Sequence, residues 1–177
     1  MRHIKLLICL FVLLSSTLNS ATTKTEATVP PTAQLKEVGQ GKMSYLFWDI
    51  YLLKLYTATG AYEGAIKSTA LEFNYLRDIE ALDLVDETEN QWRKLKLDVH
   101  PEELTWLNQL KDYWPDIKEG DQLIFYINEI GHAEFYYNEK YTGTVASIEF
   151  SDRFKQIWLS EETTAPKVRR KLLGAGK

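Results

Sequence analysis

The chain has 177 residues, of which 45% are hydrophobic, and its 21 basic and 25 acidic side chains give a formal net charge of −4. This acidic balance argues against nucleic-acid binding, which usually needs a basic surface. The single cysteine is Cys9, near the N-terminus, so the rest of the chain contains no disulfide and no cysteine metal ligand.

The N-terminus has the pattern of a secretory signal peptide over residues 1–21. Basic residues precede an apolar run, residues 6–14, and small residues follow it near Ala21. Because about 20 apolar residues are needed to span a bilayer, we predict cleavage and no transmembrane segment in the mature chain. An exported protein without disulfides suits a bacterial periplasm. Residues 22–35 are rich in Thr, Ala and Pro and are predicted to be a disordered linker before a single domain, residues 36–177.

The stretch 38–62 is the most apolar part of this domain. Alternation places apolar side chains on both faces between Tyr45 and Tyr56, too many for a surface. We predict a long strand, or two strands joined by a bend, at the centre of a covered sheet and beside any pocket. Asp49 and Lys54 are the charged exceptions, and each needs a partner or water there.

Further elements are predicted from hydrophobic periodicity. Residues 69–76 alternate as a half-buried strand, and residues 80–96 have the apolar spacing and the terminal charges of a helix. A second helix is predicted from the proline at its first position. This helix is predicted to begin at Pro101, and its buried side is predicted to consist of Leu104, Leu107, Leu110 and Trp114.

The C-terminal half predicts three short strands and two helices. Residues 122–128, 133–138 and 141–147 are separated by turn-forming residues and predict an antiparallel meander. Residues 148–159 and 167–173 have helical patterns. Because strands and helices are segregated along the chain, we predict an α+β fold in which a layer of helices covers one side of an antiparallel sheet.

Familiar catalytic and cofactor motifs are missing from the sequence, so we predict no cofactor and no metal site. The ten tyrosines are the more promising polar groups, because a hydroxyl can orient a ligand inside an apolar cavity. The candidates are Tyr51, Tyr56, Tyr75, Tyr126, Tyr136 and Tyr137. Arg77, at a strand-to-helix junction, either pairs with an acid such as Asp78 or contacts a ligand.

Four segments taken in order resemble the chalcone isomerase-like family, and in particular its exported bacterial branch. They are Val38–Lys42 leading into Trp48–Tyr56, then Leu71–Ile79, Tyr113–Asp121, and Ile157–Ser160 with Leu172–Gly174. The resemblance implies an open-faced β-sandwich, with a large antiparallel sheet and a layer of helices. Enzymes of this family close a flavanone ring, whereas related non-catalytic members bind fatty acids in the same cleft.

The resemblance carries over few of the enzymes' catalytic residues. The arginine position falls near Gly39, which leaves Lys42 as the nearest cation, and a lysine cannot reproduce a bidentate guanidinium. The threonine position falls on Tyr51. The asparagine position falls on Asn90 under one alignment, and Ser151 matches the hydroxyl of the C-terminal helix.

We therefore predict a non-catalytic periplasmic protein that binds a small apolar or amphipathic ligand, such as a fatty acid. Its predicted ligand-binding residues are Tyr51, Lys42, Arg77, Asn90 and Ser151. The alternative is an intramolecular lyase or isomerase that acts on a non-flavonoid, enone-type substrate with Tyr51, Lys42 and Ser151. A third hypothesis gives the basic C-terminal tail, Lys167 to Lys177, a weak contact with the cell envelope.

Overall fold

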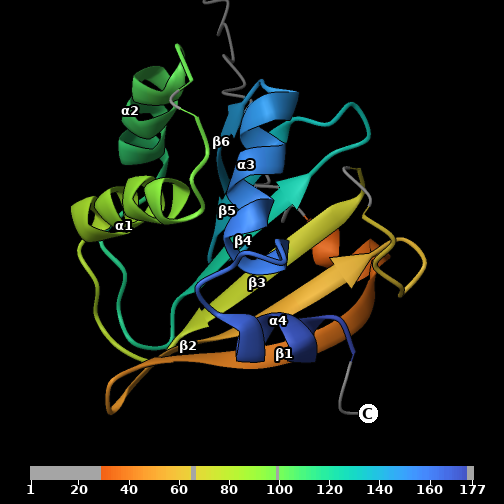
Figure 1. Cartoon of the computed structure of the whole chain (residues 1–177). Helices are drawn as coiled ribbons and strands as arrows, with labels where there is room; N and C mark the ends of the chain where they lie inside the picture. Colours follow the sequence, from red (N-terminus) through yellow and green to blue (C-terminus); the bar gives the residue numbers. More distant parts are fainter. Residues whose placement is uncertain (1–28, 65–66, 99, 175–177) are drawn as a thin grey trace, which may run out of the picture.

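The computed structural model describes residues 29–64, 67–98 and 100–174, and the predicted signal peptide lies outside them. Six strands form one antiparallel sheet in the order β1-β2-β3-β4-β5-β6. The helices gather on one face of this sheet (Figure 1). The predicted α+β class is therefore confirmed. None of the helices within the described residues is long and apolar enough to cross a bilayer.

Most predicted elements are present, with ends that shift slightly. The strands are β1 (Lys36–Tyr45), β2 (Trp48–Thr57), β3 (Thr69–Tyr75), β4 (Gln122–Ile127), β5 (Ala133–Tyr137) and β6 (Lys140–Val145). The helices are α1 (Ala81–Lys94), α2 (Glu103–Tyr113), α3 (Ile148–Leu159) and α4 (Pro166–Leu172). A short 3-10 helix, η1 (Pro31–Gln34), lies in the stretch predicted to be a disordered linker.

The stretch predicted to lie at the centre of the sheet is a hairpin at its edge. β1 and β2 pair on either side of a turn at Leu46 and Phe47, and β1 is the outermost strand. The two-strand alternative is thus confirmed, but the central position was wrong. Leu46 has a positive φ of 53°, as tight turns require, and Phe47 is 97% exposed. Apolar content alone could not separate a buried strand from an exposed apolar turn.

The core lies between the inner face of the sheet and the helices. Leu53 and Leu55 of β2 are fully buried, and β3 is buried on both faces at every residue but Asn74, so the predicted half-buried alternation of this strand was wrong. From the helix layer, Trp92 of α1 meets Phe150 of α3 edge to face, with ring centroids 6.1 Å apart. These contacts hold α1 and α3 above the sheet.

The first two helices begin at Ala81 and Glu103, one residue after the predicted start at residue 80 and two residues after the predicted start at Pro101. Asp116 Oδ1 accepts the Ala81 backbone N–H at 3.0 Å, so the cap of α1 comes from a distant loop and not from the acids beside it. In α2 the predicted burial of Leu104 was wrong, since that side chain is 69% exposed. The helix turns Trp106 toward the core instead, where it packs against Trp92.

The last helix covers the edge strand (Figure 1). At Gly39 of β1 an added Cβ would stand 2.3 Å from the Lys171 carbonyl oxygen of α4. At Gly41 the nearest atoms to such a Cβ would be a side-chain methyl carbon and the carbonyl oxygen of Val168, both at 3.2 Å. The two glycines therefore let the helix backbone approach the strand closely.

Candidate functional site

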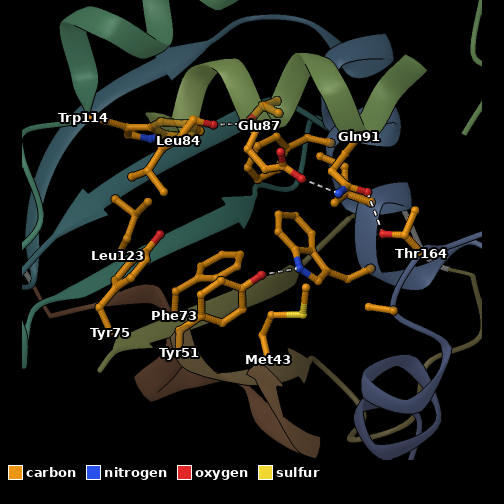
Figure 2. Close-up of a pocket in the computed structure, with 15 residues that line it drawn as sticks. Met43, Tyr51, Phe73, Tyr75, Leu84, Glu87, Gln91, Trp114, Leu123 and Thr164 are labelled. Atoms are coloured by element: carbon orange, nitrogen blue, oxygen red, sulfur yellow. Dashed lines mark hydrogen bonds between the residues drawn. The ribbon is translucent and has the colours of Figure 1, made fainter. Parts of the chain in front are cut away.

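An apolar pocket lies between the sheet and the helix layer (Figure 2). Tyr51 and Phe73 from β2 and β3 form one wall, and Leu84 and Gln91 of α1 form the opposite one. The pocket contains about 630 Å³ of space that no protein atom fills, including its opening to solvent. The centre of a water-sized sphere can move within about 100 Å³ of it. The interior of the site is therefore narrow, and it opens to solvent.

Aromatic contacts fix the sheet side of the pocket. Tyr51 of β2 and Tyr75 of β3 are directly paired in the antiparallel ladder. The Tyr51 ring meets the Phe73 ring edge to face at 5.3 Å and the Tyr75 ring at 5.6 Å. Because such pairs add to simple burial, these rings form a rigid wall.

Tyr51, the foremost candidate from the sequence, lines the pocket. Its Oη accepts a hydrogen bond from Trp158 Nε1 at 3.0 Å, which leaves its own proton free for donation. Burial raises the pKa of Tyr51 to about 12, although the Trp158 hydrogen bond opposes this. Tyr51 is therefore a neutral hydroxyl donor at physiological pH.

The raised pKa of Tyr51 predicts a loss of stability in alkali. The unfolded tyrosine deprotonates near pH 10.0, while the folded one keeps its proton until a pH of about 12. The contribution is present below pH 10.0 and is lost as the pH rises through about 12, with a slope of at most about 1.4 kcal/mol per pH unit. In urea unfolding followed by circular dichroism, Tyr51→Phe should flatten this decline. Tyr45→Phe, on an exposed turn, is the matched control, and parallel curves for wild type and Tyr51→Phe would contradict the assignment.

Two further donors in the pocket have no partner. Trp114 is 4% exposed, and its buried Nε1 has no hydrogen-bond partner among the described residues. Its indole nitrogen lies on the pocket side of the ring (Figure 2). Tyr75 Oη likewise makes no hydrogen bond within the described part of the chain, and burial raises the pKa of Tyr75 strongly. Tyr75 was among the sequence candidates for the site, whereas Trp114 was predicted only as a buried residue at the end of a helix.

The α1 side carries polar groups that satisfy one another. Thr164 Oγ1 donates to Gln91 Oε1 at 2.8 Å, and Gln91 Nε2 donates to Glu87 Oε1 at 2.5 Å. Lys94 Nζ lies 3.2 Å from the same Glu87 oxygen. Glu87 is the one carboxylate among the described lining residues, and none of them is Lys, Arg or His. The pocket therefore offers an anion no cationic partner.

Three of the other predicted site residues point elsewhere. Met43 of β1 lines the pocket, and side chains of neighbouring strand residues point to opposite sides. The Lys42 side chain therefore points away from the pocket, and it pairs with Asp49 at 2.5 Å. Asn90 lies on the exposed surface of α1. Ser151 is fully buried and donates to the Ser147 carbonyl of its own helix at 3.0 Å. The structure does not bring these side chains to Tyr51.

Arg77 also lies outside the pocket. Its guanidinium carbon stands 5.1 Å from the centroid of the Trp48 ring. Asp78, its predicted partner, pairs instead with Lys118 at 3.0 Å. Arg77 forms no ion pair within the described ranges. A cation–π contact on the β1–β2 turn therefore takes the place of the predicted local salt bridge.

Fold and site together define a class of protein: a small α+β domain with an apolar pocket between an open antiparallel sheet and its helix layer. A family model described as chalcone isomerase-like matches residues 17–174. The chain belongs to the chalcone isomerase-like family, which confirms the resemblance seen in the sequence.

Two known proteins are similar to this chain. An uncharacterized protein of Haemophilus influenzae is 28% identical over 155 residues, which cover 83% of this chain and 72% of that protein. A solved structure of a fatty-acid binding protein of Arabidopsis thaliana matches with a TM-score of 0.63 and 11% identity, covering 83% of this chain and 89% of the other. At that identity the structural match establishes the fold alone.

Proposed function

We propose that the protein is a non-catalytic carrier that binds a small amphipathic molecule with a slender apolar chain and a neutral polar head. The observation that carries this proposal is the buried, unpartnered donor Trp114 Nε1 in a mostly apolar pocket, with the Tyr75 hydroxyl, which also makes no hydrogen bond to the described residues, lining the same pocket. Fatty-acid binding by the structurally similar Arabidopsis protein supports the same class of ligand.

The unpartnered donors identify where a ligand head would bind. A buried donor without an acceptor, as Trp114 Nε1 is here, costs about 1–3 kcal/mol, and most native proteins avoid it. A ligand oxygen placed between Trp114 and Tyr75 would accept from both, and Tyr51 still has a proton to donate nearby. The pocket therefore has more donors to offer than acceptors, which suits a carbonyl, ester or hydroxyl oxygen.

The charges of the pocket favour a neutral head. An ionised carboxylate moved into an apolar site without a cation costs several kcal/mol. Glu87 would add repulsion, since its carboxylate already lies at the wall. A fatty acid would bind in its protonated form, whereas an alcohol or ester would bind at any physiological pH.

The arrangement of the candidate catalytic residues supports binding over catalysis. A lyase or isomerase using Tyr51, Lys42 and Ser151 needs the three groups around one substrate. Of these, Tyr51 alone lines the pocket.

We further propose, from the predicted signal peptide, that the carrier works in the periplasm. Recovery of the protein in the cytoplasmic fraction after osmotic shock would contradict this.

Matched ligands test the neutral-head proposal. Dodecanol and dodecanoate share their chain length and differ in head charge at pH 8. We expect dodecanol to bind at least about tenfold more tightly at pH 8 by isothermal titration calorimetry, with the gap narrowing at pH 5 as the acid gains its proton. Trp114→Phe should weaken dodecanol binding about fivefold, since it removes one hydrogen bond.

Trp106→Phe provides the control, because that indole is equally buried, at 3% exposed, but lies outside the pocket lining. Equal or tighter binding of dodecanoate at pH 8 would overturn the neutral-head assignment. Loss of dodecanol affinity in Trp106→Phe to the same degree as in Trp114→Phe would show a general packing effect in place of a lost ligand contact.

A further inference from the structure

The turn between β1 and β2 exposes four consecutive apolar or aromatic side chains, which we call the hairpin tip. Their exposed fractions are 67% for Tyr45, 76% for Leu46, 97% for Phe47 and 62% for Trp48. In Figure 1 this turn is the orange loop at the lower left, which projects beyond the neighbouring segments. A contiguous apolar surface of this kind marks a site of interaction.

Basic side chains of α4 lie beside the hairpin tip. Lys167, Arg170 and Lys171 line one hollow together with Lys42 and Ser44, and Ser44 immediately precedes the tip. Within residues 29–64, 67–98 and 100–174, none of these three α4 cations forms an ion pair. Their charge is therefore available to an external anion.

The charges directly at the tip are also cationic on balance. The Arg77 guanidinium stacks near the Trp48 ring, at 5.1 Å. Asp49 is the carboxylate next to the tip, and it is already paired with Lys42 at 2.5 Å. The tip thus combines exposed aromatic rings with positive charge, although the whole chain is acidic.

We propose that the hairpin tip inserts into the surface of an anionic lipid bilayer, while the α4 cations contact the lipid phosphates. Trp and Tyr favour the boundary between headgroups and acyl chains, and Leu and Phe favour the depth just below it. Basic side chains near an anionic surface add about 1 kcal/mol each, or about fivefold in binding. The projecting shape of the tip suits insertion into a soft interface.

A second copy of the chain fits this surface less well. In a two-fold contact the same patch meets itself, so that Lys167, Arg170 and Lys171 would face their own copies. Like charges in contact oppose such an association. An anionic bilayer satisfies the apolar and the basic parts of the surface at once.

Docking of this kind would place the pocket beside the lipid. Met43, which lines the pocket, is two positions from Tyr45 in β1, and the pocket residues Thr164 and Ala165 directly precede α4. An amphipathic ligand could then pass between bilayer and pocket over a short path. The membrane contact itself does not depend on the pocket having a ligand.

Vesicle sedimentation tests the insertion of the tip. The protein, purified with the N-terminus that the cell leaves on it, is mixed with vesicles of phosphatidylcholine containing phosphatidylglycerol or with pure phosphatidylcholine. We expect binding to the anionic vesicles, at least about tenfold weaker for Leu46→Ser combined with Phe47→Ser. Ile130→Ser is the matched control, because Ile130 is 62% exposed in a turn remote from the tip in sequence.

The charge contribution is tested with the same vesicles. Lys167→Gln combined with Arg170→Gln should lower binding to anionic vesicles by about fivefold for each charge removed, and added salt should lower the binding of the wild-type protein. Equal binding to both vesicle types without any salt dependence would overturn the anionic-lipid assignment.

Tryptophan fluorescence reports on the tip directly. Of the five tryptophans, Trp48 is 62% exposed, while Trp92, Trp106, Trp114 and Trp158 are buried. Lipids with brominated chains should quench the emission of the wild-type protein, and Trp48→Phe should abolish that quenching. Unchanged sedimentation of the tip variant, or a dimer in analytical ultracentrifugation that the tip variant dissociates, would overturn the proposal.

Discussion

Gly39→Ala is expected to destabilise the domain by about 3 kcal/mol, at the upper end of the usual cost of overpacking. The added Cβ would stand 2.3 Å from the Lys171 carbonyl oxygen and 2.7 Å from that of Leu172. Both atoms belong to the backbone, so the clash cannot be relieved by rotating a side chain, and α4 must move away from β1. Urea unfolding followed by circular dichroism measures the difference in the free energy of unfolding.

Gly41→Ala is the graded control for this prediction. A Cβ at Gly41 would lie 3.2 Å from both a methyl carbon and the carbonyl oxygen of Val168, tight contacts that a shift of a few tenths of an ångström would relieve. We expect a cost of no more than about 1 kcal/mol there. Equal effects of the two substitutions would show that β1 does not need a close approach of α4 at Gly39.

The crowding at Gly39 leaves no room at that position for the arginine that the family resemblance places near it. The resemblance places the arginine position near Gly39, and the carbonyl oxygens of α4 leave no room for even a methyl group there. The nearest cation from the sequence, Lys42, faces away from the pocket and pairs with Asp49. A guanidinium could be restored only together with a displacement of α4.

Leu84→Trp is expected to abolish ligand binding, which is the largest functional effect that the pocket predicts. Leu84 projects from α1 into the pocket opposite the aromatic wall (Figure 2). An indole in its place would fill much of the narrow interior, of which only about 100 Å³ admits the centre of a water molecule. Dodecanol affinity, measured by calorimetry, should fall by more than about tenfold.

Leu82→Trp separates a filled pocket from a general effect on the helix. Leu82 belongs to the same turn of α1 but is 57% exposed and lies outside the pocket lining. We expect this variant to bind dodecanol as the wild-type protein does and to unfold at a similar temperature. Full binding by Leu84→Trp would mean that the ligand occupies another place.

The sequence predicted the fold well where periodicity was regular. The acids and bases at the two ends of residues 80–96 predicted α1, and its buried residues include Val85, Thr88 and Trp92, as the apolar stripe required. The meander followed from turn chemistry, and Asn138 and Glu139 indeed have positive φ values of 46° and 67°. These features depend on interactions between residues that are close in the sequence, so the sequence alone is enough to predict them.

The location of the hairpin tip could not be predicted in the same way. Tyr45 to Trp48 are as apolar as a core strand, but the turn that exposes them depends on the pairing of β1 with β2 and on α4 covering the edge. Such long-range packing determines which apolar residues reach water. An apolar run interrupted by a turn is therefore ambiguous until its partners are known.

Candidate site residues were predicted unevenly for a related reason. Tyr51 could be placed from the family resemblance and strand alternation, and it does line the pocket. Trp114 was predicted only as a buried helix residue, because the lack of a partner for its Nε1 appears only when every neighbour is placed. The ligand roles of Lys42, Arg77, Asn90 and Ser151 remain predictions without support from the pocket's geometry.

Native mass spectrometry of the purified protein tests the central claim, that the pocket holds an amphipathic ligand, most directly. We predict that the wild-type protein and Leu82→Trp carry or take up one molecule of dodecanol, and that Leu84→Trp takes up none. Mild organic solvent should release the added mass. A wild-type protein that shows only its own mass, and that takes up neither dodecanol nor dodecanoate on titration, would contradict the account.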